Sequence, residues 1–303
     1  MRIEETVESP SPRFVVVHYH IFKNGGSTID SILEREFAGA FATLHGSEVS
    51  AALDQEHLES FLRRHPGVAA VSSHHLRYPK PAFRDVIIFD CCFLRHPLER
   101  LDSLYRYLRN IATVDPLAHR ARRMNARDFF RDLVSESPHL VSDVQVTQMA
   151  LSGAFTRPAH SGDLERATAI FCDAAIPGLV EMFDESLVAA EYFLRPAFPR
   201  VTWEYVPQNV SRASEMASLL RAENSQDRLA HLWGGDLYED LLRLNQLDLE
   251  LFERAQGEIR RRIALVPGSA RRVGEFRTRC AELRGAPVYA EAPAQELAHR
   301  ARS

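Results

Sequence analysis

The hydrophobic and polar positions along the chain form short apolar runs separated by longer amphipathic stretches. Apolar runs of strand length lie at residues 13–21, 67–76 and 86–95, and the last of them is apolar at nearly every position. A strand that is apolar on both faces is typical of the centre of a parallel sheet. Strands that alternate with helices predict a three-layer α/β fold with a central, mostly parallel sheet. The helical patterns that support this fold lie at residues 27–37, about 50–64 and 97–110.

The second half of the chain is predicted to be mainly helical, over about residues 115–159 and 227–262. One further strand is expected to begin at Ala169 and to end at a turn formed by Pro177 and Gly178, before an amphipathic helix. From about residue 267, arginine, alanine, glutamate and proline become frequent. We therefore expect one α/β domain over residues 1–266 and a helical or loosely packed C-terminal extension over 267–303.

The segment between the first strand and the first helix carries the clearest chemical signal. Two glycines let the backbone turn sharply, a lysine adds a cation, and the N-terminus of the following helix directs free N–H groups and a partial positive charge into the turn. The sequence predicts an anion site here. It is not a Walker A loop, because the lysine precedes the glycines. The residues of this predicted loop are Lys23, Asn24, Gly25, Gly26, Ser27 and Thr28.

A second group that suits an anion follows the apolar run at 86–95. Arg95 stands at the carboxyl end of this predicted strand, and Ser103 lies about two turns along the next helix. Ligands of open parallel sheets bind outside the carboxyl ends of the strands, so Arg95 should reach the same edge as Lys23. Arginine offers a planar fork for a phosphate and serine a neutral donor. Two separated phosphate sites are therefore predicted to face one crevice.

These segments together resemble the sulfotransferase superfamily. HIFKNGGST resembles its 5′-phosphosulfate loop, and LRHPLERLDSLYRY resembles its 3′-phosphate motif. Three later segments, beginning at Val144, Pro177 and Pro207, are similar to further elements of the family, so that the likeness covers about residues 13–212. It points to the carbohydrate branch, which contains uronyl 2-O-sulfotransferases. The chain departs from the family pattern at Phe22, Asn24 and His96.

The resemblance implies a donor, 3′-phosphoadenosine 5′-phosphosulfate, and a P-loop-like strand-loop-helix that binds its phosphosulfate. Lys23 and the backbone of residues 24–28 would hold the 5′-phosphosulfate, while Arg95 and Ser103 would hold the 3′-phosphate. Ser211 is a further candidate for contact with the nucleotide. The implied acceptor is a hydroxyl group, most simply that of a carbohydrate. Lys23 would then also stabilise the charge that develops on the leaving oxygen.

A base must take the proton of the acceptor hydroxyl, and a neutral histidine suits this role near pH 7. His74 and His75 stand at the predicted end of the second strand, and neighbouring residues of a strand face opposite sides. Only one of them should point into the crevice, and we favour His74 because it matches the family's base best. His75 and His20 are lesser candidates, and His20 would support the loop or lie near the sulfate.

A metal site and two other functions are the alternatives to this assignment. His18 and His20 lie two apart on one strand face, but with no carboxylate or cysteine beside them in the sequence we expect no metal. A P-loop-like kinase would use Asp90 to hold magnesium, although the chain lacks the G-K-[ST] signature. A nucleotide-binding protein of the same fold without catalytic activity is the remaining alternative. The arginine-rich segment at 119–131 suits a solvated helix face or a contact with an acidic substrate.

Composition and charge change this interpretation little. The chain has 303 residues, of which 45% are hydrophobic and 26% charged, and its net charge of -4 argues against binding nucleic acid through bulk charge. Cys91 and Cys92 lie inside an apolar run, which favours reduced thiols over disulfides. No segment is long and apolar enough to span a membrane, and the first residues are acidic and polar. We expect a cytoplasmic enzyme, bacterial by its arginine- and alanine-rich composition.

Overall fold

The computed structural model describes residues 12–48, 51–152, 157–208 and 225–285. Its sheet has five strands that are all parallel, in the order β2-β3-β1-β4-β5. This confirms the predicted α/β fold, and it adds the short strand β2, which the sequence pattern did not reveal. The strands are β1 (Arg13–Tyr19), β2 (Phe41–Thr43), β3 (Ala70–Ser73), β4 (Val86–Leu94) and β5 (Ile176–Leu179).

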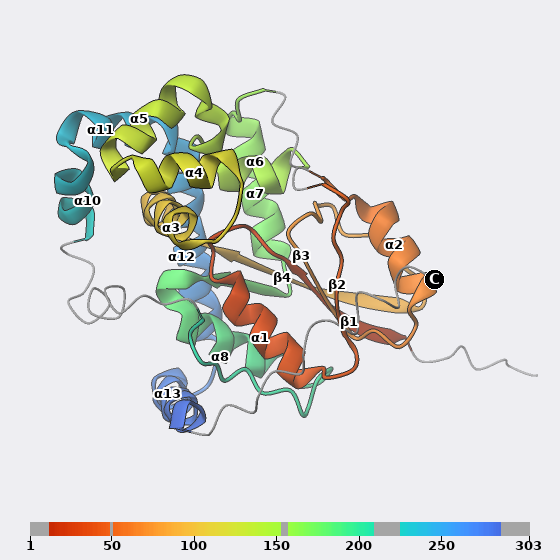
Figure 1. Cartoon of the computed structure of the whole chain (residues 1–303). Coiled ribbons are helices and arrows are strands. Elements are labelled where there is room, and N and C mark those ends of the chain that lie inside the picture. The colour runs from red at the N-terminus through yellow and green to blue at the C-terminus, as the bar shows by residue number, and fades with distance from the viewer. Residues whose placement is uncertain (1–11, 49–50, 153–156, 209–224, 286–303) are drawn as a thin grey trace, which may run out of the picture.

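Helices cover both faces of the sheet, because alternate residues of each strand face opposite sides. Val15 and Val17 of β1 join a core cluster with one set of helices, and Val16 joins a second cluster on the other face. Figure 1 shows the strands between these two layers. The first layer contains α2 (Gln55–Arg64), α6 (Val144–Ala150), α7 (Ser161–Asp173) and α12 (Gln246–Ala264), and the second contains α1 (Gly26–Glu36), α8 (Phe183–Leu194) and α13 (Ser269–Gly285).

A third hydrophobic cluster joins helices beyond the carboxyl ends of the strands. Phe129, Phe130 and Trp233 are fully buried within it. Figure 1 shows these helices gathered at one end of the molecule. They are α3 (Pro97–Asn110), α4 (Pro116–Arg123), α5 (Ala126–Glu136), α10 (Ser225–Trp233) and α11 (Gly235–Leu244).

The prediction of a strand that begins at Ala169 is wrong. Residues 169–173 end helix α7, which begins with a capping box between His160 and Asp163, and Leu164, Ala167 and Phe171 form its buried stripe. The strand is instead β5, which includes the supposed turn at Pro177 and Gly178. Proline lacks an N–H group, and β5 tolerates it because this strand lies at the edge of the sheet.

The C-terminal part is helical where the structure describes it. Helix α13 packs against α8, with Val273, Phe276 and Cys280 buried in the same cluster as Val16 of the sheet. Residues 269–285 therefore form a helix with one buried stripe, and the division of the chain at residue 266 stays a prediction. Within the described ranges, no helix is long and apolar enough to cross a membrane.

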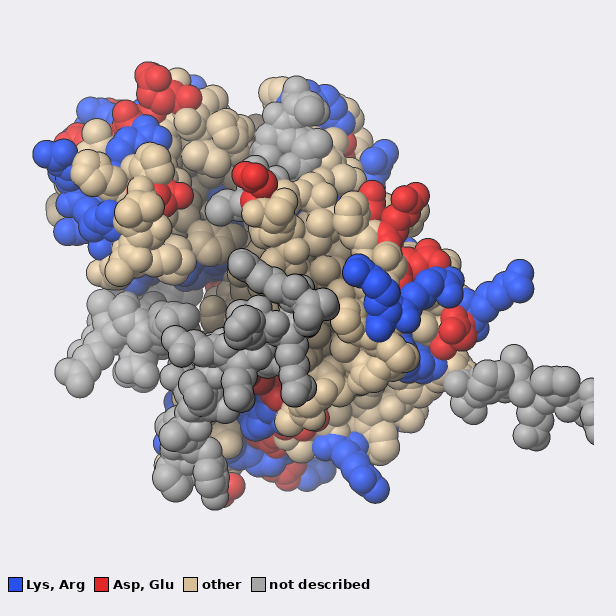
Figure 2. All heavy atoms as spheres, turned by 45° about the vertical axis from the view of Figure 1, so that its right-hand side comes forward, with Lys and Arg blue, Asp and Glu red and all other residues tan. Residues whose placement is uncertain are grey.

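Arginines of the segment 119–131 form ion pairs with acidic residues. Arg120 contacts Asp132 at 2.5 Å, and Arg127 and Arg131 both contact Asp236 of α11. On the face shown in Figure 2, positive and negative side chains are interspersed. These contacts favour the solvated-face interpretation, in which the arginines connect α4, α5 and α11.

Candidate functional site

The predicted anion loop joins β1 to α1 and depends on both of its glycines. Gly25 has a positive φ of 75°, which residues other than glycine rarely adopt, and it is the N-cap residue of α1. A Cβ atom on Gly26 would lie 1.9 Å from Nε2 of His20. The backbone therefore turns closely around His20. The N–H groups of Gly26 and Ser27, the first two of α1, precede the first intrahelical hydrogen bond, which Thr28 donates to the backbone oxygen of Gly25 at 3.0 Å, and they can bind an anion.

Asn24 ties this loop to the end of β4. Its side-chain Nδ2 donates to the backbone oxygen of Phe93 at 2.9 Å and to Oε1 of Gln145 at 2.8 Å. The same Oε1 of Gln145 accepts from the backbone N–H of Arg95 at 3.0 Å, and Nε2 of Gln145 donates to the backbone oxygen of Arg95 at 2.9 Å. The loop and the residue that follows β4 are thus held by one buried amide.

The structure brings Arg95, Lys23 and the inner face of α3 together. Arg95 donates to the backbone oxygen of Lys23 at 3.4 Å, and its guanidinium lies 3.9 Å from Glu99. Ser103 is one helical turn from both Glu99 and Tyr107, so that these three side chains share a face of α3. The Nζ atom of Lys23 lies 4.3 Å from the centroid of the Tyr107 ring. Ser103 therefore belongs to the helix face that meets the loop.

The electrostatics of this group favour an anion. Burial and, to a smaller extent, the positive charges of Arg95 and Arg106 together lower the pKa of Lys23 to about 8. The buried Nε atom of Arg95 has no hydrogen-bond partner among the described residues. Burial also lowers the pKa of Arg95. A bound anion would compensate these positive charges and provide an acceptor for the Arg95 guanidinium.

Of the two candidate bases, His74 faces the loop and His75 does not. The Nδ1 atom of His74 lies 3.2 Å from the backbone oxygen of His20, and its ring packs against the His20 ring at an interplanar angle of 37°, with centroids 3.7 Å apart. The Nδ1 atom of His75 instead accepts from the backbone N–H of Gly46 at 2.8 Å. Burial lowers the pKa of His74 to about 4, with a smaller contribution from His20.

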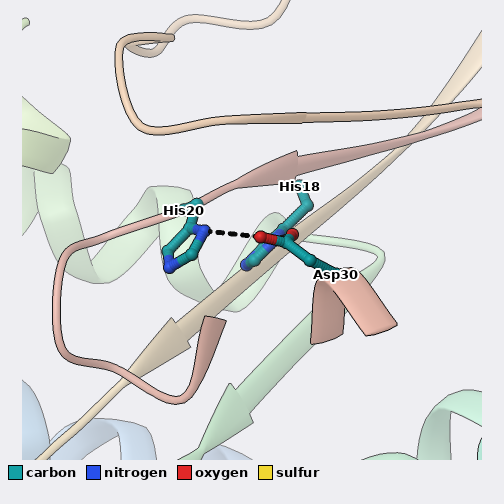
Figure 3. A group of neighbouring side chains, drawn as sticks. All are labelled: His18, His20 and Asp30. Atoms are coloured by element: carbon teal, nitrogen blue, oxygen red, sulfur yellow. Dashed lines mark hydrogen bonds and ion pairs between the residues drawn. The ribbon is translucent and has the colours of Figure 1, made fainter. Parts of the chain in front are cut away.

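His18 and His20 lie on one strand face, and the carboxylate of Asp30 bridges them (Figure 3). The Nδ1 atoms of His18 and His20 contact separate oxygens of Asp30, at 2.8 and 3.0 Å. Burial alone would raise the pKa of Asp30, but the two hydrogen bonds outweigh it and hold that pKa well below its usual range. The carboxylate missing from the sequence near His18 is therefore supplied by α1. Because each nitrogen faces its own oxygen, we interpret these contacts as hydrogen bonds that fix both rings.

Asp90 has protein partners that account for its burial. Its Oδ1 atom accepts from Nζ of Lys80 at 2.6 Å and from the backbone N–H of Ala175 at 3.2 Å, and its Oδ2 atom accepts from Tyr78 at 3.3 Å. These contacts connect β4 with the loop before it and with β5. They favour a structural role for Asp90 over the magnesium site of a kinase.

The segment that leads to Ser211 reaches the anion loop. The backbone N–H of Gln208 donates to Oγ1 of Thr28 at 3.1 Å. Ser211 itself lies outside the described residues, so its expected contact with the nucleotide stays a prediction.

Sequence reasoning missed Gln145, Asp30 and Arg106. Asp30 follows Gly26 by four residues, so helical spacing places it over the glycine turn, and this signal was available in the sequence. Arg106 follows Ser103 by one turn and was equally accessible. Gln145 is 121 residues away from Asn24, and no local pattern connects the two.

No family model matches this chain. The chain is similar to an uncharacterized protein of Archaeoglobus fulgidus, with 26% identity over 250 residues that cover 80% of this chain and 96% of that protein. The description of that relative contains no activity. The function is therefore inferred from the site itself.

Proposed function

We propose that this protein is a sulfotransferase that moves the sulfuryl group of 3′-phosphoadenosine 5′-phosphosulfate to a hydroxyl group. The observation that carries the proposal is the convergence of two cationic groups at one edge of the sheet. Lys23, with the start of α1, and Arg95 meet there and are connected by a hydrogen bond of 3.4 Å. This arrangement suits a nucleotide with anionic groups at two positions.

The residues present fit such a donor. The backbone of residues 24–28 and Lys23 would hold the phosphosulfate, because the start of α1 offers N–H groups without intrahelical acceptors and Lys23 adds a cation. Arg95 would hold the 3′-phosphate through a guanidinium whose Nε atom has no partner among the described residues, and Ser103 would add a neutral donor. The donor supplies an activated sulfuryl group and a phosphate oxygen on which negative charge develops during transfer.

Lys23 would stabilise this developing charge. Its ammonium lies over the ring of Tyr107 and near Arg95, where burial excludes part of the solvent. A fixed cation in such a site stabilises a transition state more than in water, because it needs little reorganisation. Removal of one such group typically costs about 3 kcal/mol of transition-state stabilisation.

His74 would act as the general base. A backbone carbonyl can only accept a hydrogen bond, so the Nδ1 atom of His74 donates to His20 and the Nε2 atom keeps the lone pair. Its lowered pKa, about 4, keeps the ring neutral near pH 7. His20, fixed by Asp30, sets the position of His74 through its backbone oxygen and its ring.

A carbohydrate hydroxyl is the acceptor that we propose. This choice rests on the likeness of the loop and of the motif from Arg95 to Tyr105 to the carbohydrate branch of the sulfotransferases. A cytoplasmic location and the absence of a nucleic-acid partner stay predictions from composition and charge.

Binding measurements test the proposal directly. We expect the purified protein to bind 3′-phosphoadenosine 5′-phosphate in calorimetric titration more tightly than ATP with magnesium, whereas a kinase would show the reverse preference. Lys23→Ala or Arg95→Ala should abolish transfer of labelled sulfate to carbohydrate acceptors. Binding of the bisphosphate without transfer to any acceptor would identify a non-catalytic nucleotide-binding protein. Failure to bind it would exclude the proposed donor.

A further inference from the structure

A single side chain, the amide of Gln145, connects the two proposed anion-binding groups. Gln145 is 1% exposed. Its oxygen accepts from Asn24 of the loop and from the backbone N–H of Arg95, and its nitrogen donates to the backbone oxygen of Arg95. Both polar atoms of the amide are therefore used. Neither neighbour can move relative to the other without loss of a buried hydrogen bond.

Asp248 of helix α12 fixes the position of Gln145. Asp143, the N-cap residue of α6, makes no side-chain hydrogen bond to its own helix. The carboxylate of Asp248 caps α6 instead, because it accepts from the backbone N–H groups of Gln145 and Val146 at 3.0 and 2.8 Å. Asp248 is fully buried, and its carboxylate also lies 3.4 Å from Nε2 of Gln145. The backbone and the side chain of Gln145 are thus both fixed.

We infer that Gln145 is a positioning residue that sets the separation between the anion site at the start of α1 and the anion site at Arg95. The inference rests on the proposed function, because that function says which ligand uses both sites. A ligand with two anionic groups gains from a fixed separation, since binding of one group brings the other to its site at high effective concentration. A ligand with one anionic group gains nothing from it. Gln145 therefore favours nucleotides with two phosphates over those with one.

The affinity ratio between two kinds of nucleotide tests this inference. Calorimetric titration would compare adenosine 3′,5′-bisphosphate with adenosine 5′-phosphate and adenosine 3′-phosphate. Methionine has a side chain of similar length that lacks the amide. In Gln145→Met we therefore expect the affinity for the bisphosphate to fall by about tenfold or more. The affinity for each monophosphate should change by less than about threefold. A residue that only supports the fold would lower all three affinities alike.

Gln148→Met is the matched control, because Gln148 lies three residues along the same helix and is half-buried. It should leave the ratio of bisphosphate affinity to monophosphate affinity unchanged.

Asn24→Ala removes the same connection from the side of the loop. In the double variant Asn24→Ala/Gln145→Met, this affinity ratio should therefore fall no further than in the more affected single variant. An unchanged ratio in Gln145→Met, or an equal change in Gln148→Met, would overturn the inference.

Amide hydrogen exchange of the free protein separates this inference from the proposed function. Gln145→Met should speed exchange at residues 22–26 and 95–96, and Gln148→Met should not. If the wild-type protein shows no preference for the bisphosphate, the donor proposal fails. Unchanged exchange at these residues in Gln145→Met would contradict the positioning role, whichever ligand the protein binds.

Discussion

The Nδ1 atom of His74 lies 3.2 Å from the backbone carbonyl oxygen of His20, which fixes the neutral tautomer of His74 with its lone pair on Nε2. The Nε2 atom of His74 is thus a proton acceptor of fixed orientation beside the anion loop. His75, the next residue, is directed to Gly46.

Replacement of His74 by alanine should remove turnover and spare nucleotide binding. The ring contributes a base and no positive charge near pH 7, so its loss should lower kcat by about 10²- to 10⁴-fold. Transfer of labelled sulfate and titration with 3′-phosphoadenosine 5′-phosphate measure the two effects. His75→Ala is the control and should keep most of the activity. Equal losses in both variants would show that His74 is not the base.

The pH dependence of kcat/KM should be bell-shaped with unusual limits. His74 must be neutral to accept a proton, so the rate should fall as the pH decreases through about 4, the lowered pKa of this ring. Lys23 must be charged, so the rate should fall as the pH rises through about 8. Lys23→Arg should remove the upper limit, because arginine stays protonated throughout this range. An acid limit near 6.5, the usual value for histidine, would contradict the assigned environment of His74.

Lys23 should react with amine-directed reagents faster than Lys80. These are the two lysines of the chain, which makes the comparison internal. Lys23 has a pKa lowered to about 8 and is therefore partly unprotonated at pH 8, whereas Lys80 pairs with Asp90 at 2.6 Å. Mass spectrometry after brief acetylation measures both. Bound 3′-phosphoadenosine 5′-phosphate should protect Lys23 alone, and labelling of Lys80 first would refute this prediction.

Gly26→Ala should destabilise the protein and disturb the site. The new methyl group would lie 1.9 Å from Nε2 of His20, so either the ring or the start of α1 must shift. Such overpacking typically costs about 1–3 kcal/mol, which chemical denaturation would detect. Gly67→Ala is the control, because a Cβ atom there has no neighbour within 4 Å. Equal stability of the two variants would argue against the close contact of His20 with the loop.

Asp30→Asn should lower stability at neutral pH by about 1–3 kcal/mol, because the new amide cannot accept from both imidazoles. The pKa of Asp30 in the folded protein lies below its unfolded value, so its contribution is present above about pH 4 and is lost as the pH falls. Unfolding curves at pH 7 and pH 3 measure this difference.

The exposed pair of Asp54 and His57, 2.7 Å apart, provides the control for Asp30. Asp54→Asn should change stability by less than about 1 kcal/mol. If His18, His20 and Asp30 held a metal ion instead of hydrogen bonds, a chelator would lower the melting temperature of the wild-type protein. We expect no such change.

The periodicity of the sequence was sufficient for most of the fold. The apolar run that became β4 was recognisable because both of its faces are buried or half-buried from Ile88 onward, and the helical stripe after Pro97 became α3. The sequence pattern did not predict β5, because Pro177 and Gly178 are typical of turns and only the edge position lets them form a strand. The short β2 carried too few residues for a pattern.

By itself, the sequence determined the local chemistry of the site: a glycine turn after a strand, a lysine within it, an arginine at a strand end and paired histidines. These features depend on residues that are close in the chain, and backbone geometry converts their spacing into direction. Only the tertiary structure decided that Gln145 connects Asn24 to Arg95, that Asp30 holds His18 and His20, and that His74 faces the loop. The contacts of Gln145 and His74 join residues 50 to 121 positions apart. Such contacts arise when parallel strands bring distant segments to one edge of the sheet, and the local periodicity of the sequence does not predict them.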